Sequence, residues 1–387
     1  MDIEKKKIIL QVLPSLDMGG AEEGTVEIAL FMKKMGWKTI VASSSGSLVK
    51  KLVLNDIKHI ELPLKTKNPL IIFYNIFLLI WVIKKKNIKI VHVRSRAPAW
   101  SAFIACKMLR GIKFITTVHG AYQNQNVLKR FYNSIMTKGY KTIAISKYIK
   151  KYLINNFKFT KKKKENIVVI PRGVALDKYN VNKVSTKRMI VLMKNWEIPD
   201  GIPIILFPSR IASFKGHITL LKAISVLKKD KKNQFMCLMV GSIKENSNIG
   251  ERLISFIDKN QLNNVVKFAG KCSDMPAAYK LSDIVVSPAE KPEGFGRIII
   301  EAQAMQRPII ASAHGGSVEL IKHNYNGFLF NPSDEYDLAN KIKYILCLTK
   351  KKKKKIISLA YHLVREQYNL NNMCESNFKL YNSLINK

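Results

Sequence analysis

Acidic residues are scarce in this chain of 387 residues. It carries 27 Asp and Glu against 66 Lys and Arg, so its formal net charge is +39 at pH 7. A surface with this charge attracts anions. Because 47% of the residues are hydrophobic and 24% are charged, the composition is still that of a folded globular protein. It excludes a disordered, collagen-like or coiled-coil chain.

Arginine is also scarce, since it supplies only eleven of the 66 basic residues. Proteins that read nucleic acids rely on the flat arginine fork, which matches phosphates and base edges. The lysines here are scattered, so we expect no specific nucleic-acid partner. Two interpretations of the charge stay open: a solvated lysine-rich surface that follows from biased composition, and a positive face held at an anionic membrane surface.

Cysteines are few, and no two of them lie close together in the sequence. The five (Cys106, Cys237, Cys272, Cys347 and Cys374) form no CxxC pair and no Cys/His cluster, which indicates free thiols in a reducing compartment. The N-terminal stretch has a short apolar run but no cleavage-site pattern, so we interpret it as a first strand rather than a signal peptide. We therefore expect a cytoplasmic protein.

No apolar run is long enough to cross a bilayer. The longest, Pro69 to Ile83, has fifteen residues and is interrupted by Asn75, whereas a spanning helix needs about 20. One interpretation is a helix packed hard against a sheet. The other is a helix partly sunk in a membrane interface beside Lys84 to Lys86, which would make the protein peripheral on the inner face of the cytoplasmic membrane.

Several signatures of catalysis are absent. The sequence has no GxxxxGK[ST], no GxSxG, no HExxH and no Asp-x-Asp pair that could hold a divalent ion on a sugar diphosphate. The Gly294-Phe295-Gly296 segment is not a dinucleotide fingerprint, because Ile299 stands where the third glycine belongs. These absences exclude P-loop, α/β-hydrolase and zinc-protease chemistry and weigh against a nicotinamide enzyme.

Short apolar runs alternate with segments of helical period along the whole chain, which is typical of βαβ units and parallel sheets. The fold class is therefore α/β. In the first half we predict seven strands: Lys7 to Leu13, Thr39 to Ala42, His59 to Leu62, Ile90 to Val93, Lys113 to Val118, Thr142 to Ile145 and Val168 to Ile170. In the second half we predict five: Ile204 to Pro208, Phe235 to Val240, Val265 to Phe268, Ile284 to Ser287 and Pro308 to Ala311.

Helices are expected between these strands, at Glu22 to Met35, Ser146 to Asn156 with Ser146 as N-cap, His217 to Lys229 and Arg297 to Met305. The alternation lapses at Val174 to Pro199, which is the candidate linker. We expect an N-terminal Rossmann-like domain over residues 1–180, a second one over residues 190–365, and a C-terminal helix at 366–387 that packs back on the first domain. Two such domains would face each other across a ligand-binding cleft. The lysine runs Lys161–Lys164 and Lys350–Lys355 are expected to be exposed loop or helix ends.

Groups suited to binding anions and hydroxyls follow the ends of several strands. Gly19-Gly20-Ala21-Glu22 opens a helix after the first strand, and glycine lets backbone N–H groups approach a ligand closely. Arg210 and Lys215 lie five residues apart in the loop after Ile204 to Pro208, where they could converge on one diphosphate. A plain tight turn and ordinary surface lysines are the alternatives at these two places.

Two acids flank the most distinctive loop. Glu293 precedes Gly294, Phe295 and Gly296, and Glu301 follows about two turns into the next helix. Carboxylates accept hydrogen bonds from sugar hydroxyls, and free N–H groups at a helix start favour phosphate. Helix capping and surface charge explain the same pattern equally well. His119 ends the strand Lys113 to Val118, where a histidine is either structural or directed at the same ligand.

These residues together resemble family 4 glycosyltransferases. The order of the Gly-Gly-Ala-Glu loop, His119-Gly120, Ile170 to Val174, Ser209-Arg210 with Lys215-Gly216, and Glu293 to Glu301 is that of the family. The later segments Gly315-Gly316 with Glu319 to Ile321, and Asn326 to Leu329, match as well, so the resemblance covers essentially the whole chain. It implies the GT-B fold, retaining transfer from a nucleotide-sugar donor, and no cofactor or metal requirement.

The resemblance also implies roles for individual residues. Arg210 and Lys215 would hold the donor diphosphate, Glu301 the ribose and Glu293 the hydroxyls of the sugar, next to Gly294, Phe295 and Gly296. His119 would contact the sugar near the reacting carbon, and Gly20 would lie beside the donor phosphate. Arg94, Ser95 and Arg96 look like the acceptor-side loop of members that build surface polysaccharide or lipopolysaccharide. Arg172 departs from the pattern, since many members have asparagine there.

The sequence therefore predicts a hexosyltransferase with a lipid-linked, polysaccharide or lipopolysaccharide acceptor, as used in building a cell envelope. Two alternatives stay open. A sugar-nucleotide epimerase or a phosphorylase would share the GT-B fold without this acceptor. A non-catalytic basic protein that binds anions or nucleic acid would exploit the charge of +39 and would show strongly salt-dependent binding.

Overall fold

The apolar runs of the sequence form two parallel β-sheets. The structure is a computed structural model that describes residues 7–17, 19–122, 126–159, 164–230, 234–242 and 248–385. The chain divides into an N-terminal unit, Met1–Arg172 with Leu370–Lys387, and a C-terminal unit, Gly173–Asn369. The predicted α/β class is confirmed. The lysine run Lys161–Lys164 lies outside the described residues apart from Lys164.

The N-terminal unit is built on a sheet in the order β3-β2-β1-β4-β5-β6-β7, and neighbouring strands pair in parallel. Its strands are β1 (Ile8–Ser15), β2 (Lys38–Ser44), β3 (Lys58–Glu61), β4 (Ile90–Val93), β5 (Lys113–Val118), β6 (Lys141–Ala144) and β7 (Ile167–Val169). All seven coincide with predicted strands to within two residues at either end. The order reverses between β1 and β4, which is where ligands bind in open α/β sheets.

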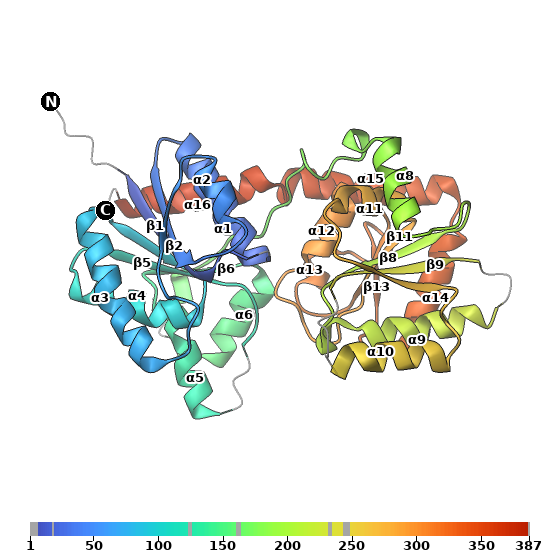
Figure 1. The fold of residues 1–387 in the computed structure, drawn as a ribbon, viewed down its shortest axis with the longest axis horizontal. Coiled ribbons are helices and arrows are strands. Elements are labelled where there is room, and N and C mark those ends of the chain that lie inside the picture. The colour runs from blue at the N-terminus through green and yellow to red at the C-terminus, as the bar shows by residue number, and fades with distance from the viewer. Residues whose placement is uncertain are drawn as a thin grey trace. The chain divides into compact units, whose positions relative to one another are not determined.

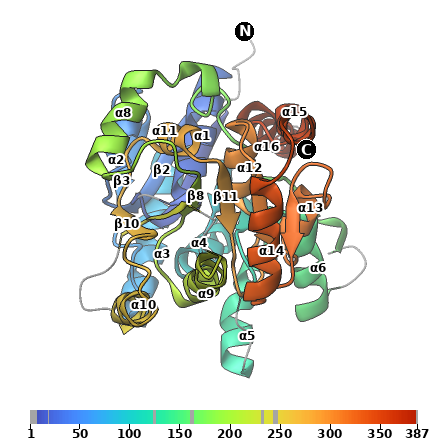
Figure 2. The same ribbon diagram turned by 90° about the vertical axis from the view of Figure 1, so that its right-hand side faces the viewer.

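Helices cover both faces of this sheet (Figures 1 and 2). They are α1 (Gly20–Lys34), α2 (Val49–Val53), α3 (Pro69–Lys85), α4 (Arg96–Met108), α5 (Val127–Ser134) with η1 (Ile135–Thr137), α6 (Lys147–Asn156) and α16 (Leu370–Ile385). Ser146 caps α6 as predicted, because its hydroxyl accepts a hydrogen bond from the Ile149 amide at 3.0 Å. The last helix, α16, packs against α1, with Phe31 and Phe378 in edge contact at 6.4 Å.

The C-terminal unit is built on a sheet in the order β10-β9-β8-β11-β12-β13, again all parallel. Its strands are β8 (Ile204–Pro208), β9 (Met236–Val240), β10 (Val266–Gly270), β11 (Ile284–Ser287), β12 (Ile309–Ser312) and β13 (Phe328–Phe330). Its helices are η2 (Val181–Lys183), α8 (Thr186–Asn195), η3 (Ser213–Lys215), α9 (His217–Lys228), α10 (Asn248–Lys259), α11 (Met275–Leu281), α12 (Arg297–Ala304), α13 (Ser317–Leu320), α14 (Glu335–Leu346) and α15 (Lys350–Gln367). The short strand β13, which has only three residues, was not predicted from the sequence.

The segment Val174 to Pro199 is not the plain linker that the sequence suggested. It contains α8, which packs against α11. Arg188 on α8 donates two hydrogen bonds to the Asp274 carboxylate, at 2.7 Å and 2.5 Å. The prediction failed because α8 has only ten residues, and its apolar residues form one continuous run, Met189 to Met193, which does not distinguish a helix from a strand. The ion pair joins residues far apart in the sequence and leaves no local signal.

The apolar run at Pro69 forms a helix, as predicted. α3 begins at Pro69 after an Asn68 cap and ends at Lys85. Within the described residues, no helix combines the length and the apolar character that crossing a membrane requires. The other lysine run, Lys350–Lys355, forms the first turns of α15 and is mostly exposed, in agreement with the prediction.

Candidate functional site

The loop between β8 and α9 is fixed by Gly216. Its backbone has φ +82°, and a Cβ placed there would lie 1.7 Å from the carbonyl oxygen of Pro288, at the end of β11. Only glycine fits both constraints. The loops after β8 and β11 are further joined by a hydrogen bond from the Glu290 amide to the Phe214 carbonyl oxygen, at 2.9 Å. Two loops far apart in sequence thus form one surface.

Lys215 and Glu293 meet on this surface. The Lys215 ammonium donates a hydrogen bond to the Glu293 carboxylate, and their side chains are only 18% and 16% exposed. Arg210 is exposed, and its guanidinium carbon lies 6.0 Å from the centre of the Phe214 ring, while Lys215 Nζ lies 5.6 Å from the same ring. The structure therefore brings the three charged residues singled out from the sequence into one neighbourhood of the C-terminal unit.

The turn of two glycines that follows β12 supports the Glu293 loop. The Gly316 amide donates to the Glu293 carbonyl oxygen at 2.9 Å. Gly315 has φ +60°, and a Cβ on it would lie 2.6 Å from the same oxygen. Gly294 is half-buried, while Phe295 and Gly296 are buried. Close packing therefore fixes the backbone that leads into α12. The same packing explains why glycines occupy the Gly315-Gly316 turn.

Glu301 is buried one helical turn further along α12. Tyr279 donates from its hydroxyl to one carboxylate oxygen at 2.9 Å, and the Arg297 guanidinium lies 2.9 Å from the other. Burial, followed by the charge of Glu301, raises the pKa of Tyr279 well above its usual range, so this phenol stays a donor. Each carboxylate oxygen keeps a second lone pair for a further hydroxyl.

His119 follows β5 in the N-terminal unit with a shielded and unsatisfied ring nitrogen. Its Nε2 atom is buried and has no hydrogen-bond partner among the described residues. Burial, and then the positive charges of Arg172 and Arg94, lower the pKa of this histidine well below 6.5, so the imidazole is neutral at pH 7. A neutral imidazole nitrogen without a partner is suited to a hydrogen bond with a ligand hydroxyl.

Arg172 supports the start of α1. Its guanidinium donates a hydrogen bond to the Gly20 carbonyl oxygen. Gly24, one turn later, leaves room for the same guanidinium, since a Cβ there would lie 2.1 Å from Nη1 of Arg172. The arginine that replaces the asparagine of many family members thus has a defined contact, because it reaches the glycine loop.

The three acceptor-side residues Arg94, Ser95 and Arg96 separate in the structure. Arg94 is buried, and its Nη2 donates to Gln11 Oε1 at 2.7 Å. Ser95 and Arg96 instead line a hollow of about 540 Å³ within the N-terminal unit. The Arg96 guanidinium is held by Asn133 Oδ1 at 2.8 Å and lies over the Tyr122 ring at 4.7 Å. Arg94 therefore packs against the central strand β1 rather than lining the hollow.

This hollow is positively charged. Its lining is assembled from the end of β1, the segment after β3, the start of α4 and α5, namely Pro14, Leu64, Lys65, Thr66, Lys67, Ser95, Arg96, Ala97 and Tyr132. Lys65 forms an ion pair with Asp17 at 3.1 Å, while Lys67 is exposed. Lys65, Lys67 and Arg96 thus outnumber Asp17, the acid that pairs with Lys65. The sequence analysis missed Lys65, Lys67 and Tyr132, because they lie in three segments without a shared motif.

The described residues hold no group of three or more His, Cys, Asp or Glu side chains placed to bind a metal ion. The sequence analysis also missed Tyr279, which has no local signal: its partner Glu301 lies 22 residues further along the chain.

Comparison with known proteins adds family information to this geometry. The profile of the family "Glycosyl transferases group 1" matches residues 190–362, and that of "Glycosyltransferase Family 4" matches residues 18–178. A crystal structure of a glycosyltransferase from Rickettsia africae is 41% identical in sequence, with a TM-score of 0.89 over 98% of this chain and 99% of that one.

More distant relatives share the same fold or length. The crystal structure of the Anabaena protein HepE, in complex with UDP and glucose, is 21% identical with a TM-score of 0.83 over 97% of this chain and 100% of that one. An N,N'-diacetylbacillosaminyl-diphospho-undecaprenol alpha-1,3-N-acetylgalactosaminyltransferase of Campylobacter jejuni is 26% identical over 82% of this chain and 83% of its own.

Proposed function

The chain belongs to the family 4 glycosyltransferases, and from this premise we propose that it moves a hexose-type sugar from a nucleotide-sugar donor to a lipid-linked or polysaccharide acceptor, with retention of configuration. One observation carries the proposal: Lys215 and Glu293 meet beside Arg210 at the ends of two neighbouring strands. The UDP and glucose in the Anabaena structure make UDP-glucose the first donor to test.

In this proposal the cations of the C-terminal unit bind the donor diphosphate. Arg210 grips two phosphate oxygens, and Lys215 exchanges its Glu293 partner for a third. The exchange frees the Glu293 carboxylate to accept hydrogen bonds from the sugar hydroxyls. Glu301, held by Tyr279 and Arg297, accepts from the ribose. A second role follows for Lys215: its pairing with Glu293 keeps a carboxylate beside the phosphate site neutralised until the donor arrives.

The same groups lower the barrier of transfer. When the glycosyl–phosphate bond breaks, negative charge grows on the departing diphosphate, and prearranged cations stabilise that charge. The N–H groups at the start of α12, beside Gly294 and Gly296, add to this stabilisation. In this proposal a metal ion is not required. His119, neutral and with Nε2 unsatisfied, accepts or donates a hydrogen bond to the sugar, and Gly20 lies beside the donor phosphate.

We assign the positively charged hollow of the N-terminal unit to the acceptor. Arg96, Lys65 and Lys67 fit an acceptor that carries an anionic group, such as the phosphate of a lipid-linked sugar. The name of the Campylobacter relative, which includes a diphospho-undecaprenol acceptor, supports this class. The proposal includes action at the inner face of the cytoplasmic membrane, where such an acceptor is reached.

A thermal-shift panel of UDP-, GDP- and ADP-sugars in the presence of EDTA tests the donor assignment. We expect one nucleotide class to raise the unfolding temperature, because a ligand that binds only the folded state stabilises it. Stabilisation by none of them contradicts the proposal. Donor consumption that requires a sugar acceptor separates transfer from epimerisation.

The variant Glu293→Gln tests the carboxylate. We expect it to lose turnover while it still binds the nucleotide. Glu335→Gln is the matched control, because Glu335 pairs with Lys222 at 3.6 Å on the same unit and has no proposed role. Equal turnover of both variants and the unchanged protein counts against the assignment of Glu293.

A further inference from the structure

The helix α3 exposes an apolar face although its opposite face is already buried. Residues on the inner face, such as Ile76, Leu79 and Val82, are at most 4% exposed. On the outer face, five large side chains are each more than half exposed: Leu70, Phe73, Tyr74, Phe77 and Trp81. A soluble surface rarely gathers so many large apolar side chains on one helix, and such a patch marks a contact with a partner or a membrane.

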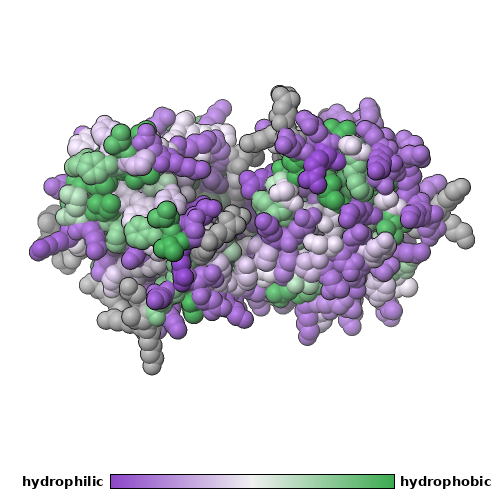
Figure 3. Space-filling model, turned by 90° about the horizontal axis from the view of Figure 1, so that it is seen from below, coloured by the Kyte–Doolittle hydropathy of each residue, from purple (hydrophilic) through white to green (hydrophobic). Residues whose placement is uncertain are grey.

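The helix α5 extends this apolar surface. Its side chains Val127, Leu128 and Phe131 are 82%, 79% and 63% exposed. The helix α4 lies between α3 and α5 and contacts both, since Ser101 donates to the Ile72 carbonyl oxygen at 2.7 Å and the rings of Trp100 and Phe131 lie 5.2 Å apart. We call the eight exposed residues on α3 and α5 the α3–α5 face. Figure 3 shows apolar side chains gathered on the N-terminal unit amid a mostly hydrophilic surface.

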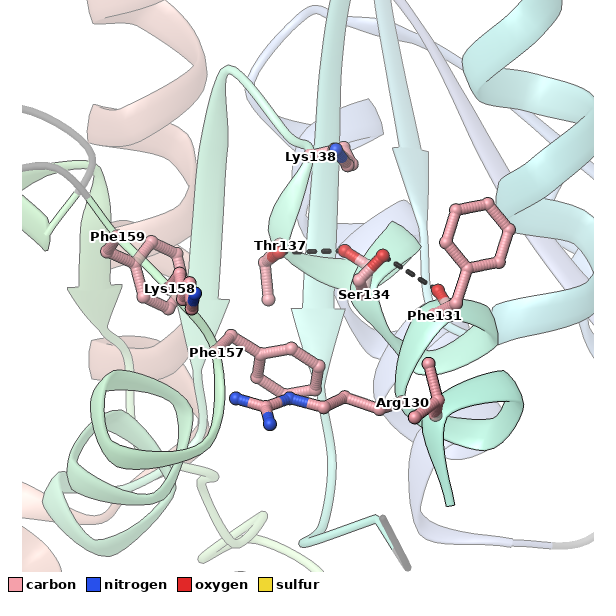
Figure 4. A pocket seen from close by; sticks show the side chains of 9 residues that line it. Arg130, Phe131, Ser134, Thr137, Lys138, Phe157, Lys158 and Phe159 are labelled. Carbon is pink, nitrogen blue, oxygen red and sulfur yellow. Dashed lines mark hydrogen bonds between the residues drawn. The ribbon is translucent and has the colours of Figure 1, made fainter.

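Cations accompany the apolar side chains. Lys84 and Lys85 end α3, and Lys85 Nζ lies 4.4 Å from the Trp81 ring centre. Beside α5, a hollow of about 330 Å³ is lined by both aromatic and basic side chains, among them Arg130, Lys138 and Lys158. Figure 4 shows the Arg130 guanidinium reaching across the hollow toward the Phe157 ring. Within the described part of the chain, no carboxylate pairs with these three cations.

This combination favours one occupant over the others. A second copy of the chain would place the same cations against one another, and like charges across an interface oppose association. A nucleic-acid backbone satisfies the cations but gives nothing to exposed aliphatic side chains such as Leu70 and Leu128. An anionic bilayer satisfies both, because aromatic rings settle at the headgroup level and lysines and arginines reach the lipid phosphates.

We propose that the α3–α5 face docks the N-terminal unit on an anionic phospholipid membrane. The apolar side chains of α3 and α5 enter the interfacial layer, and the hollow beside α5 receives a lipid phosphate between Arg130, Lys138 and Lys158. The inference gives the membrane part of the proposed function a defined surface. It does not depend on turnover, since a bound membrane is read out without any donor or acceptor.

Vesicle flotation tests the proposal. The full chain is mixed with phosphatidylcholine vesicles that contain or lack phosphatidylglycerol. We expect flotation only with phosphatidylglycerol, and weaker flotation as salt is raised. The double variant Arg130→Ala/Lys158→Ala should bind roughly tenfold more weakly or worse and show a smaller salt dependence. Phe77→Ser/Trp81→Ser should lose a similar share of binding while the salt dependence stays as it was.

Matched controls come from exposed residues of the C-terminal unit. Lys354→Ala/Lys355→Ala removes the same charge, and Tyr336→Ser/Tyr344→Ser removes two exposed rings. Neither should change flotation. The proposal is overturned if the unchanged protein stays unbound at low salt, if the control pairs weaken binding equally, or if the α3 variant instead breaks up a dimer seen by sedimentation. Thermal unfolding of every variant is also measured with and without donor. The unfolding temperature without donor shows whether a variant is misfolded, and its shift on adding donor tests the donor assignment independently of membrane binding.

Discussion

The two charged surfaces of this glycosyltransferase are built in opposite ways. In the C-terminal unit, Lys215 and Glu293 form an ion pair, and glycines with positive φ allow the loops to pack closely. In the N-terminal unit, the hollow around Arg96 is lined by lysines from a loop, with one acid beside them. The proposed donor surface is thus preorganised by its backbone, whereas the proposed acceptor surface depends on separate side chains that a small number of substitutions could retune.

The largest effect is expected at Lys215. Lys215→Ala removes a cation from the proposed diphosphate site and leaves the Glu293 carboxylate without its partner. Removing one prearranged group that stabilises transition-state charge typically lowers kcat by about 10²–10³-fold. We expect a loss of that order, measured as donor consumption with acceptor present.

Two further variants make the Lys215 result specific. Lys215→Arg, which keeps the charge, should recover part of the activity. Lys222→Ala breaks another lysine–glutamate pair on α9 and should leave kcat unchanged. If Lys222→Ala lowers kcat as much as Lys215→Ala, the loss of activity does not come from the proposed diphosphate site.

A methyl group added at Gly216 should disrupt the preorganised loop between β8 and α9. Gly216→Ala forces a left-handed backbone on alanine and drives Cβ against the Pro288 carbonyl oxygen. We expect a loss of about 3 kcal/mol or more in the free energy of unfolding, measured by urea denaturation. Gly201→Ala is the control: φ there is +78° and nothing lies within 4 Å of the added Cβ, so only about 1 kcal/mol of backbone strain is expected. Equal losses would show that crowding at Pro288 is relieved by a loop movement.

At the proposed acceptor surface, Arg96→Ala should change the affinity for the acceptor and not the chemical step. Hydrogen bonds from a charged donor are worth about 1.5–3 kcal/mol, so the KM for an anionic acceptor should rise roughly 10- to 100-fold. The donor KM and kcat should stay within about twofold, as steady-state kinetics would show. Arg110→Ala, at an exposed arginine of the same unit, is the control. A fall in kcat with an unchanged acceptor KM would move Arg96 to the reacting centre.

Sequence patterns predicted the strands that lead into the proposed donor loops because these elements are local. Ile204 to Pro208 and Ile284 to Ser287 are short buried runs, and each is followed within nine residues by its charged or glycine-rich loop. The α/β class and both parallel sheets follow from the same alternation. The roles proposed for Arg210, Glu293, Glu301 and His119 remain predictions.

The rest depends on contacts that the sequence does not display. Tyr279 reaches Glu301 from another helix, and α8 is held to α11 by Arg188 and Asp274, 86 residues apart. Arg94 and Arg96 look alike in sequence, but one points into the sheet and the other into the hollow, because the chain passes from strand to helix between them. Side-chain direction at such a junction depends on the exact end of the strand, which is the least certain feature of a sequence pattern.

The loop of the C-terminal unit also leaves a pH signature. His217 follows Gly216 and is buried with its ring centre 4.6 Å from that of Phe207. Burial is the main cause that lowers its pKa from 6.5 to about 4. The unfolded chain therefore binds a proton between pH 6.5 and 4 that the folded chain does not. The contribution of His217 to the free energy of unfolding is therefore fully present above pH 6.5 and decreases as the pH is lowered toward 4.

Urea denaturation at pH 7.5 and pH 5.5 measures this effect. His217 alone should account for a loss of about 1 kcal/mol over that interval. His217→Asn, which cannot titrate, should show a correspondingly smaller difference between the two pH values, whatever its absolute stability. An unchanged difference would assign the pH dependence to other histidines whose pKa values burial also lowers, namely His59, His92, His119 and His323.

The smallest effect is expected where α8 meets α11, away from both charged surfaces. Arg188 and Asp274 form a two-pronged ion pair with side chains 39% and 28% exposed, and burial of this degree leaves the charges partly screened by water. Arg188→Ala should therefore cost only about 1 kcal/mol of unfolding free energy, with donor binding and turnover unchanged. Asp274 also accepts a hydrogen bond from the Ala277 amide at the start of α11, so Asp274→Ala should cost more than Arg188→Ala. If the order is reversed, the further hydrogen bond from Arg188 to the Lys183 carbonyl oxygen, at 2.8 Å, contributes more to stability than the bond from the Ala277 amide to Asp274.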